Sequence, residues 1–307
     1  MTIEDLGTLP DGRIVRRVRL SHEGATLDVL DLGAAVDAWV PRGARRSVVV
    51  GFDGDVAARW ERRGGYPNIV AGRVISRVRD GRFTLDGSTY QLATNENGHT
   101  LHGGPDGFDA RTWTIDETGD DHVTLSLVSP DGDQGFPGTV VATATYRLTV
   151  DAVTIELEAT TDAPTVVALG SHPYFHVGVD PVLTVPAERW VPVDDENVAL
   201  PGSATVAGSG FDLRRGLPVG PETGLDASFL VDGEGPRLMA RLAGGDGTVE
   251  VHGDQVALQV YTGAERGIAL EVQPESDAPN RTPEDVVLRP GGRFTSVAAW
   301  RFEPRAD

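Results

Sequence analysis

The sequence contains no cysteine and no lysine, and each absence excludes a class of chemistry. Without cysteine among its 307 residues, the chain can form no disulfide and no cysteine-based zinc or redox site. Without lysine, all 27 basic residues are arginines. A Schiff-base lysine and the phosphate-binding lysine of a P-loop are therefore excluded as well.

Long apolar segments are also missing. No stretch of 18 consecutive apolar residues occurs, so we expect no membrane-spanning helix. The N-terminal residues "MTIEDLGTLPDGRIVRR" lack the apolar segment of a signal peptide. The net charge of −19 argues against binding to the phosphates of nucleic acids. We therefore expect a cytoplasmic protein that binds neither membranes nor nucleic acids.

Helical periodicity is scarce, and strand patterns dominate the chain. Seven segments are rich in β-branched residues and alternate between polar and apolar side chains, namely 122–128, 140–150, 152–160, 248–253, 255–263, 267–273 and 294–302. Turn sequences such as "PDGD", "GGDG" and "PGG" separate them. The best helical candidate, 55–63, is short. The pattern predicts a single all-β domain over residues 1–307, mostly antiparallel and of the sandwich type.

Two of these strands have one apolar face and one face that carries polar groups. The apolar faces hold Val256, Leu258 and Val260 in one strand and Ile268, Leu270 and Val272 in the other. The opposite faces hold Ala257, Gln259 and Tyr261, and Ala269, Glu271 and Gln273. A strand with one apolar face needs to be covered on one side only. We therefore expect Gln259 and Glu271 to line a polar concavity.

Four of the seven histidines form two tight groups, and their setting narrows the possible chemistry. His99 and His102 form one group, and His172 and His176 form the other. Both lie among strand and turn patterns and lack an HExxH motif, which argues against a zinc site. No GxSxG nucleophile elbow occurs, and "HGGPDG" lacks the strand–turn–helix setting of a phosphate-binding loop. General acid–base chemistry by histidine and carboxylate remains, and we expect no metal site.

Two histidines have neighbours that suggest a function. Pro173 restricts the backbone of His172 to extended conformations, and the aromatic rings of Tyr174 and Phe175 could shield it or stack on a ligand. In "TLHGG", His102 precedes two glycines, whose missing side chains leave room for the close approach of a ligand. We therefore treat both histidines as candidate site residues.

Seven ordered segments resemble the aldose 1-epimerase (galactose mutarotase) family. They are "GRVISRVRDGRFTLDGSTYQLATNENGHTLHGGPDGFDARTW", "SPDGDQGFPGTVVATATYRLT", "GSHPYFHV", "GLDASFLVDG", "LQVYTG", "LEVQPESDAPN" and "VVLRPGGRF". The resemblance covers roughly residues 30–304. It implies a galactose-mutarotase-like β-supersandwich with an open sugar cleft and no cofactor.

The resemblance also implies a role for each matching residue. Glu271 of "LEVQ" corresponds to the general base, and His172 of "SHPYF" corresponds to the general acid. The residues expected to bind the sugar are Arg77, His102, Tyr174, Asp226 and Gln259. The substrate is expected to be a hexose such as glucose or galactose, bound by a monomer or a homodimer.

The implied reaction is mutarotation. Glu271 takes the proton of the C1 hydroxyl while His172 donates a proton to the ring oxygen. The ring opens, the C1–C2 bond rotates, and the ring closes on the other face of the carbonyl. We expect His172 to be protonated near neutral pH because neighbouring carboxylates raise its pKa.

The motifs depart from the family pattern at several positions. Ser171, His176 and Ser76 stand where asparagine is usual, and Ala227 stands where histidine is common. The segment between "YTG" and "LEVQ" is short. Several of these positions are expected near the rim of the sugar site, where they would affect substrate preference.

Three different functions are also compatible with the sequence. An epimerase of phosphorylated or sulfonated hexoses would share the fold but need a cationic pocket, which the forked donors of Arg73 or Arg111 could supply. A non-catalytic carbohydrate-binding protein would also suit the fold. A glycoside hydrolase could use Asp226 and Glu271 as its pair of carboxyl groups.

Overall fold

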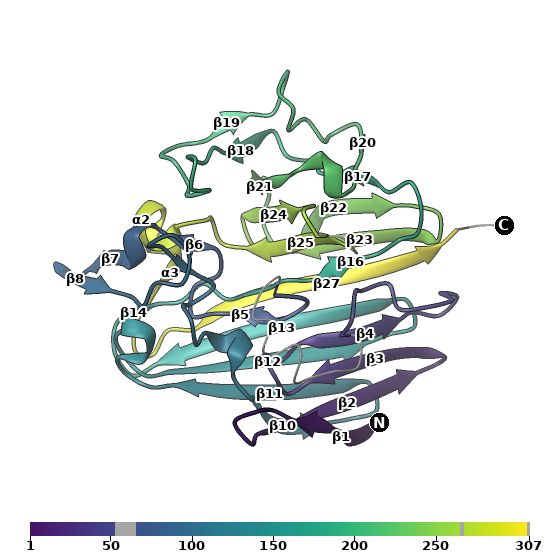
Figure 1. Cartoon of the computed structure of the whole chain (residues 1–307), viewed down its shortest axis with the longest axis horizontal. Helices are drawn as coiled ribbons and strands as arrows, with labels where there is room; N and C mark the ends of the chain where they lie inside the picture. Colours follow the sequence, from purple (N-terminus) through teal and green to yellow (C-terminus); the bar gives the residue numbers. More distant parts are fainter. Residues whose placement is uncertain (53–65, 265–266, 306–307) are drawn as a thin grey trace.

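Antiparallel strands dominate the computed structural model of the chain, which describes residues 1–52, 66–264 and 267–305 (Figure 1). The α-helices of this described part are the single turns α2 (Ala278–Arg281) and α3 (Pro283–Val286). No helix among these residues is long and apolar enough to cross a membrane. The helical candidate at 55–63 lies outside the described residues.

The largest sheet has nine strands in the order β10-β11-β12-β13-β27-β23-β22-β17-β20. Their bounds are Thr114–Thr118, His122–Ser129, Val140–Leu148, Ala152–Thr161, Phe294–Pro304, Gly247–Gly253, Arg237–Ala243, Val182–Thr184 and Leu217–Pro218. The central strands β11, β12, β13 and β27 run side by side across the molecule (Figure 1). This sheet forms one layer of the sandwich.

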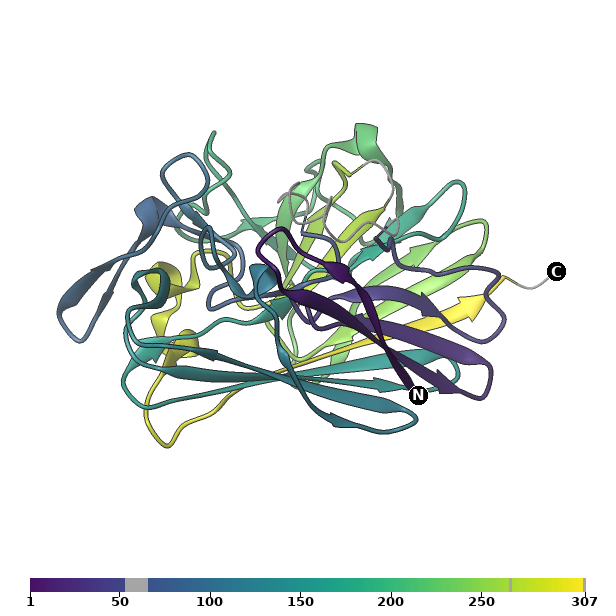
Figure 2. The same ribbon diagram turned by 60° about the horizontal axis from the view of Figure 1, so that its bottom comes forward.

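Two smaller sheets cover different halves of the nine-stranded sheet. One is β1-β2-β3-β4, with bounds Thr2–Thr8, Ile14–His22, Ala25–Leu30 and Val36–Val40. The other is β16-β25-β24-β21-β18-β19, with bounds Tyr174–Phe175, Ile268–Gln273, Ala257–Tyr261, Asp226–Leu230, Arg189–Val191 and Ala204–Thr205. Strands β2 and β3 contact β12, and β25 contacts β23, so the two sheets form the second layer (Figure 2).

Short ladders connect this second layer to the loops around it. They pair β5 (Val70–Ala71) with β15 (Gly170–Ser171) and β6 (Arg77–Val78) with β9 (Thr100–Leu101). They also pair β7 (Arg82–Leu85) with β8 (Ser88–Gln91) and β14 (Thr165–Val166) with β26 (Val287–Leu288). None of these short strands is among the seven that the sequence pattern predicts.

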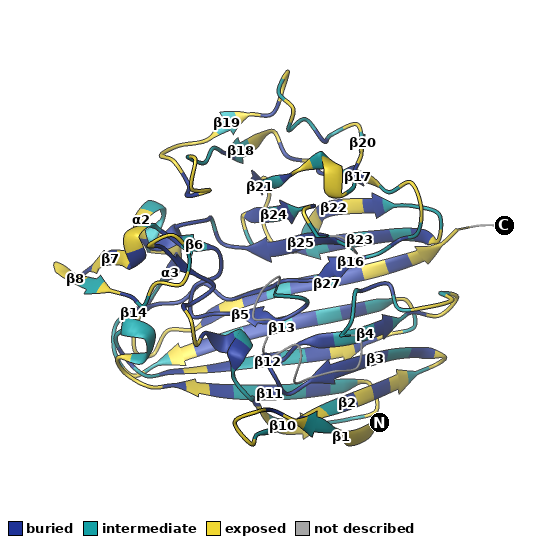
Figure 3. Cartoon of the chain, viewed as in Figure 1, coloured by how far each residue is buried: buried dark blue, intermediate teal, exposed yellow. Residues whose placement is uncertain are grey.

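Alternating side chains place the core between the layers. In β12 the residues Val140, Ala142, Ala144, Tyr146 and Leu148 are buried, whereas the residues between them are partly or fully exposed (Figure 3). The Trp300 ring of β27 packs edge-on against Phe175 of the six-stranded sheet, with 5.2 Å between ring centres. It also packs at a tilt against Trp39 of β4, with 6.0 Å between ring centres. Aromatic packing therefore links the nine-stranded sheet to both sheets above it.

The predicted architecture is confirmed in its main features. All seven predicted strands are present, and the fold is an antiparallel β-sandwich. Two details were wrong. Strand β25 is buried on both faces rather than one, and Val256 precedes β24 and is 44% exposed. The extent of a single domain over residues 1–307 stays a prediction.

Arg73 is a buried charge with a structural role. Its side chain is 1% exposed, and its guanidinium donates to the carbonyl oxygens of Ser129, Pro130 and Pro137 at 2.8–2.9 Å. Its Nε donates to the Ser129 hydroxyl at 2.9 Å. Burial lowers the pKa of Arg73 to about 10, which still leaves it charged at neutral pH. Arg73 therefore ties down the connection between β11 and β12 and is not the ligand-binding donor that its motif suggested.

We predict that Arg73→Met lowers the free energy of unfolding by about 3 kcal/mol or more, because several buried carbonyl groups lose their donors. Arg293→Met is the control, since Arg293 is 58% exposed and pairs with Glu158 on the surface. That change should cost less than about 1 kcal/mol. Urea unfolding measures both, and equal losses in the two variants would contradict the role of Arg73.

Candidate active site

A cavity of about 200 Å³ lies on the polar face of the six-stranded sheet, and we call it the central cavity. Its lining residues are Tyr66, Ser76, Arg77, Glu96, Leu101, His102, His172, Tyr174, Asp226, Gln259, Tyr261 and Glu271. All seven site residues predicted from the sequence are among them. Segments separated by about two hundred positions in the chain are thus brought together at one place.

The register of the sheet explains why the side chains of its strands converge. Glu271 of β25 pairs with Gln259 of β24, and Tyr261 of β24 pairs with Asp226 of β21. Directly paired residues point to the same face of a sheet. The predicted shared face of Gln259 and Glu271 is therefore confirmed.

His172 lies between β15, which pairs with β5, and β16, which pairs with β25. Its N–H donates to the Ile69 carbonyl and its own carbonyl accepts from the Asn68 N–H, both at 2.9 Å. The Asn68 side chain accepts from the Tyr174 N–H at 2.7 Å. Pro173 between them has no N–H to satisfy, and its carbonyl accepts from Leu270. The backbone on both sides of His172 is thereby fixed.

His172 and Glu271 form a buried pair at one corner of the central cavity. His172 Nε2 lies 3.4 Å from Glu271 Oε1, and the two residues are 5% and 2% exposed. His172 Nδ1 is buried and has no hydrogen-bond partner among the described residues. His172 therefore faces Glu271 through Nε2, the ring nitrogen that can exchange a proton with this carboxyl group or with a ligand. The Tyr174 ring stacks on the imidazole at 5.1 Å between ring centres.

Burial controls the protonation of this pair. It lowers the pKa of His172 to about 4 and raises the pKa of Glu271 well above its usual value. The expectation that carboxylates keep His172 protonated near neutral pH is therefore wrong for the free protein, because desolvation outweighs the backbone hydrogen bond that raises the His172 pKa. Without a ligand, the favoured arrangement is therefore a neutral imidazole beside a neutral carboxyl group.

His102 is held as a neutral donor beside the pair. Its Nδ1 accepts from the Ser76 N–H at 3.2 Å, which leaves the proton on Nε2. Burial lowers the pKa of His102 well below its usual value, and His172 and Arg77 lower it further. A Cβ on Gly103, which has φ +90°, would meet the Gly72 carbonyl oxygen at 1.9 Å. This glycine therefore permits the close approach of the protein backbone and not, as we expected, of a ligand.

A wall of polar side chains extends from Arg77 to strands β21 and β24. Arg77 donates from Nε and Nη2 to the Glu96 carboxylate at 2.5 and 3.1 Å. Its Nη1 lies 3.9 Å from Asp226 Oδ2, and Asp226 Oδ1 accepts from the Gln259 amide at 2.6 Å. Burial raises the pKa of Asp226, whereas Arg77 and the Gln259 hydrogen bond oppose that rise. The wall thus presents both donors and acceptors to a polyhydroxyl ligand.

Aromatic rings complete the enclosure. The Tyr66 ring lies edge-on to His102 at 4.6 Å and 6.2 Å from His172. Burial raises the pKa of Tyr66 to about 12, so its hydroxyl is neutral at physiological pH. Together with Tyr174, this ring provides an apolar surface against which the C–H groups of a ligand can pack. Among the described residues, no group of three or more His, Cys, Asp or Glu side chains could hold a metal ion.

Comparison with known proteins identifies the family. The model of the family described as aldose 1-epimerase matches residues 16–300. The chain belongs to the aldose 1-epimerase family. It is 32% identical to the aldose 1-epimerase of Escherichia coli K12 over 95% of this chain and 96% of that protein. It is 30% identical to the galactose mutarotase of Bos taurus over 96% of each chain.

The fold agrees with solved members of the family. An aldose epimerase homologue from C. elegans superimposes with a TM-score of 0.86 at 25% identity, over 94% of this chain and 99% of that chain. A galactose 1-epimerase from Lactobacillus acidophilus gives the same TM-score at 24% identity over 99% of both chains, a likeness in fold. The galactose-mutarotase-like fold is therefore confirmed, and the chain is an isomerase of carbohydrates.

The departures from the family motifs lie mostly away from the central cavity. Ser76 lines it, and its hydroxyl donates to Ser276 at 2.9 Å. Ser171 pairs with Val70 in a ladder, and Ala227 is packed in the core. His176 lines a different cavity. Ser171 and Ala227 directly adjoin cavity-lining residues, and neighbouring residues of a strand point to opposite faces. The effect of these departures on substrate preference stays a prediction.

Sequence reasoning missed several functional positions. Tyr66 and Glu96 line the central cavity and carried no separate signal, although Glu96 lies within a segment that matches the family. Asn68 fixes the backbone around His172 from a distant part of the chain. Tyr261 could have been found, since alternation placed it on the face of Gln259.

We predict that the His102 and His172 imidazoles do not titrate between about pH 5.5 and 8, because burial lowers both pKa values. His122 is the internal control, since its contact with Asp121 raises its pKa above the ordinary value. Imidazole 1H–15N correlation spectra over this range measure all three rings. A midpoint near pH 6.5 for His102 would contradict its assignment as a buried neutral donor.

Proposed function

We propose that the protein is a mutarotase that interconverts the α and β anomers of a neutral hexose such as glucose or galactose. The observation that carries this proposal is the buried pair of His172 and Glu271, 3.4 Å apart at the central cavity. At about 200 Å³, the cavity is smaller than the roughly 300–1,000 Å³ of sites for drug-sized ligands. That size favours a single sugar ring.

Ring opening requires proton movement at two adjacent oxygens. The C1 hydroxyl and the ring oxygen are bonded to the same carbon, so one proton acceptor and one proton donor must meet at neighbouring atoms. In our proposal Glu271 takes the proton of the C1 hydroxyl and His172 Nε2 protonates the ring oxygen. After rotation about C1–C2, the two residues exchange roles, and the ring closes with the other configuration.

The coupling of the two residues makes this exchange possible without uptake of a proton from solvent. The neutral pair and the pair of imidazolium and carboxylate hold the same number of protons. Sugar hydroxyl groups that donate to the Glu271 carboxylate stabilise its charged form and favour the second arrangement. Sugar binding thus supplies the hydrogen bonds that stabilise a charged carboxylate in this buried pair. After one anomeric conversion, the pair has the protonation state with which it began.

Two positioned groups are enough for the chemistry. General acid and general base catalysis each contribute about 10² to 10⁴-fold to a rate. Independent contributions from His172 and Glu271 would together lower the barrier by roughly 5–11 kcal/mol. In the proposal Arg77, His102, Asp226 and Gln259 hold the sugar hydroxyl groups, and Tyr174 and Tyr66 cover its apolar surface.

The charges at the central cavity favour a neutral sugar over an anionic one. Arg111 is engaged by the Asp133 carboxylate at 2.6 Å and by the Asp106 carbonyl, and it does not line the central cavity. Arg73 is buried among backbone carbonyls. The two arginines considered for phosphate binding are therefore committed elsewhere. We also propose that the protein is cytoplasmic, that it acts on a monosaccharide as a monomer or homodimer, and that it binds no nucleic acid.

Sugar binding without catalysis and glycoside hydrolysis fit this geometry less well. A non-catalytic sugar-binding protein has no use for a desolvated acid–base pair in contact. A glycoside hydrolase would need Asp226 as its second carboxyl group, but this group is occupied by Gln259 and faces Arg77. Mutarotation uses the histidine and the carboxylate that are in contact.

We predict that Glu271→Gln and His172→Asn each reduce kcat/KM for mutarotation by about 10²-fold or more. The matched controls are Glu250→Gln and His252→Asn, because this histidine and carboxylate lie 3.3 Å apart on β23, outside the central cavity. The controls should retain full activity. Polarimetry of freshly dissolved α-anomers of glucose and galactose measures the rates, and thermal unfolding checks the fold.

Polarimetry, a sugar-binding measurement and a chromogenic glycoside assay together separate the three functions. Near-normal activity of either active-site variant would contradict the proposed acid–base pair. A wild-type protein that binds the sugar without changing the rate would be a carbohydrate-binding protein. Release of a chromogenic aglycone would indicate a glycoside hydrolase.

The dependence of kcat/KM on pH should be flat around neutrality and fall on both sides. Addition of a further proton to the pair and loss of one each leave a net charge on it, so burial disfavours both. We therefore expect constant kcat/KM between about pH 5.5 and 8. Anomeric exchange NMR measures it, and a single transition near pH 6.5, typical of an unperturbed histidine, would contradict the coupled pair.

A further inference from the structure

We propose that Glu96 is a specificity-determining residue that occupies the forked edge of Arg77 and makes the central cavity reject anionic sugars. Sugars that carry a phosphate, a sulfonate or a carboxylate form the rejected class. This inference deepens the proposed function and rests on it, because it concerns which aldoses reach the pair of His172 and Glu271. It follows from the geometry of one ion pair and from the charges around it.

Glu96 takes the two donors with which Arg77 would bind an anion. Its Oε2 accepts from Nε at 2.5 Å, and its Oε1 accepts from Nη2 at 3.1 Å. This is the bidentate geometry with which arginine recognises carboxylate or phosphate groups. The remaining Nη1 lies 3.9 Å from the Asp226 carboxylate. A phosphate could therefore bind this guanidinium only by displacing a carboxylate that is already in place.

The lining of the central cavity carries more acidic than basic groups. Its described residues include Arg77 as the one arginine, against the carboxyl groups of Glu96, Asp226 and Glu271. His102 adds no positive charge, because burial lowers its pKa well below the usual value. Glu96 cancels Arg77, and the pair of His172 and Glu271 has no net charge, so an anionic substituent would meet the Asp226 carboxylate without a compensating cation. A neutral hexose can still use the donors and acceptors of the same wall.

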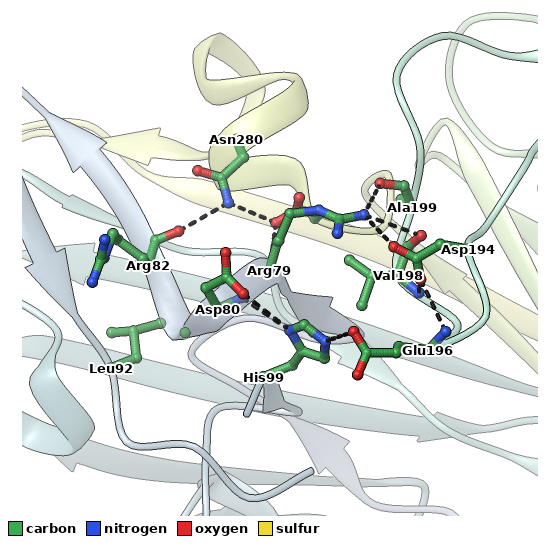
Figure 4. Close-up of polar contacts among 12 residues, drawn as sticks. Arg79, Asp80, Arg82, Leu92, His99, Asp194, Glu196, Val198, Ala199 and Asn280 are labelled. Atoms are coloured by element: carbon green, nitrogen blue, oxygen red, sulfur yellow. Dashed lines mark hydrogen bonds and ion pairs between the residues drawn. The ribbon is translucent and has the colours of Figure 1, made fainter. Parts of the chain in front are cut away.

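The position of Glu96 is built into a short turn. The Asn95 side chain is bonded to both backbone groups of Leu101, and the Glu96 and His99 backbones bond to each other. The buried ring of His99, at the end of this turn, lies between Asp80 and Glu196 (Figure 4). Its Nδ1 accepts from the Asp80 N–H at 2.9 Å, and its Nε2 lies 3.3 Å from the Glu196 carboxylate. These contacts fix the backbone of the turn that carries Glu96.

The ladder beneath the turn sets the partner of Glu96. Leu101 of β9 pairs with Arg77 of β6, so the turn that carries Glu96 leads directly into the strand beside Arg77. The ion pair joins the two sides of one small supersecondary unit. This arrangement is more specific than a chance contact between exposed side chains.

Substitution of Glu96 tests the inference. The measured quantity is the ratio of kcat/KM for glucose to kcat/KM for glucose 6-phosphate, determined by anomeric exchange NMR with the uncatalysed rates subtracted. Glu96→Gln keeps an oxygen acceptor for Arg77 and removes one negative charge. It should lower the ratio about tenfold, mainly through a lower KM for the phosphorylated sugar.

Two further variants control for other effects. Glu158→Gln makes the same chemical change at a surface glutamate that also pairs with an arginine, Arg293, at 2.7 Å on the nine-stranded sheet. Glu96→Asp keeps the charge at the central cavity. Both variants should leave the ratio within about twofold of the wild-type value, and thermal unfolding confirms that each variant is folded.

The possible outcomes distinguish failure of this inference from failure of the proposed function. A ratio that is unchanged in Glu96→Gln, or lowered equally in Glu158→Gln, overturns the role of Glu96 and leaves mutarotase activity intact. Equal wild-type activity on the two sugars does the same. A wild-type protein that accelerates exchange of the phosphorylated sugar alone, or of neither sugar, overturns the proposed function itself.

Discussion

Desolvation of one histidine and one carboxylate in contact is the constraint on which the candidate active site depends. In water, His172 and Glu271 would exchange protons with solvent independently. In the protein, each is nearly inaccessible, and the charged form of each is disfavoured by burial. The two groups therefore behave as one unit with a fixed number of protons. A sugar that bridges them changes where those protons lie without changing how many there are.

The sandwich keeps Glu271 desolvated because β25 is covered on both faces. The apolar side chains Ile268, Leu270 and Val272 pack into the core between the layers, where their burial stabilises the fold. The opposite face holds Glu271 against the loops that carry His102 and Arg77. A strand exposed on that side would leave Glu271 solvated, with an ordinary pKa and no coupling to the histidine. Burial of β25 thus both stabilises the strand and raises the pKa of Glu271.

Local sequence patterns predicted the strands and the shared face of Gln259 and Glu271, because alternation depends only on near neighbours. Motif resemblance placed seven residues that all line the central cavity. What the sequence could not provide depends on contacts between distant segments. Asn68 fixes the backbone around His172 across about a hundred positions, and Glu96 meets Arg77 through a ladder of two-residue strands. The protonation of His172 was predicted wrongly because burial is a property of the folded chain.

Arg73 and Arg77 show why residue type and spacing are insufficient for such conclusions. They lie four positions apart and offered the same forked donors to a ligand. The folded chain surrounds Arg73 with neutral carbonyl oxygens, which satisfy its donors in a buried position. It surrounds Arg77 with the carboxylates of Glu96 and Asp226, which cancel its charge at the central cavity. Lysine, with a compact charge and three donors, could not make either arrangement in the same geometry. The chain uses arginine once to hold a loop and once to order a polar wall, and the partners, not the motif, decide between the two.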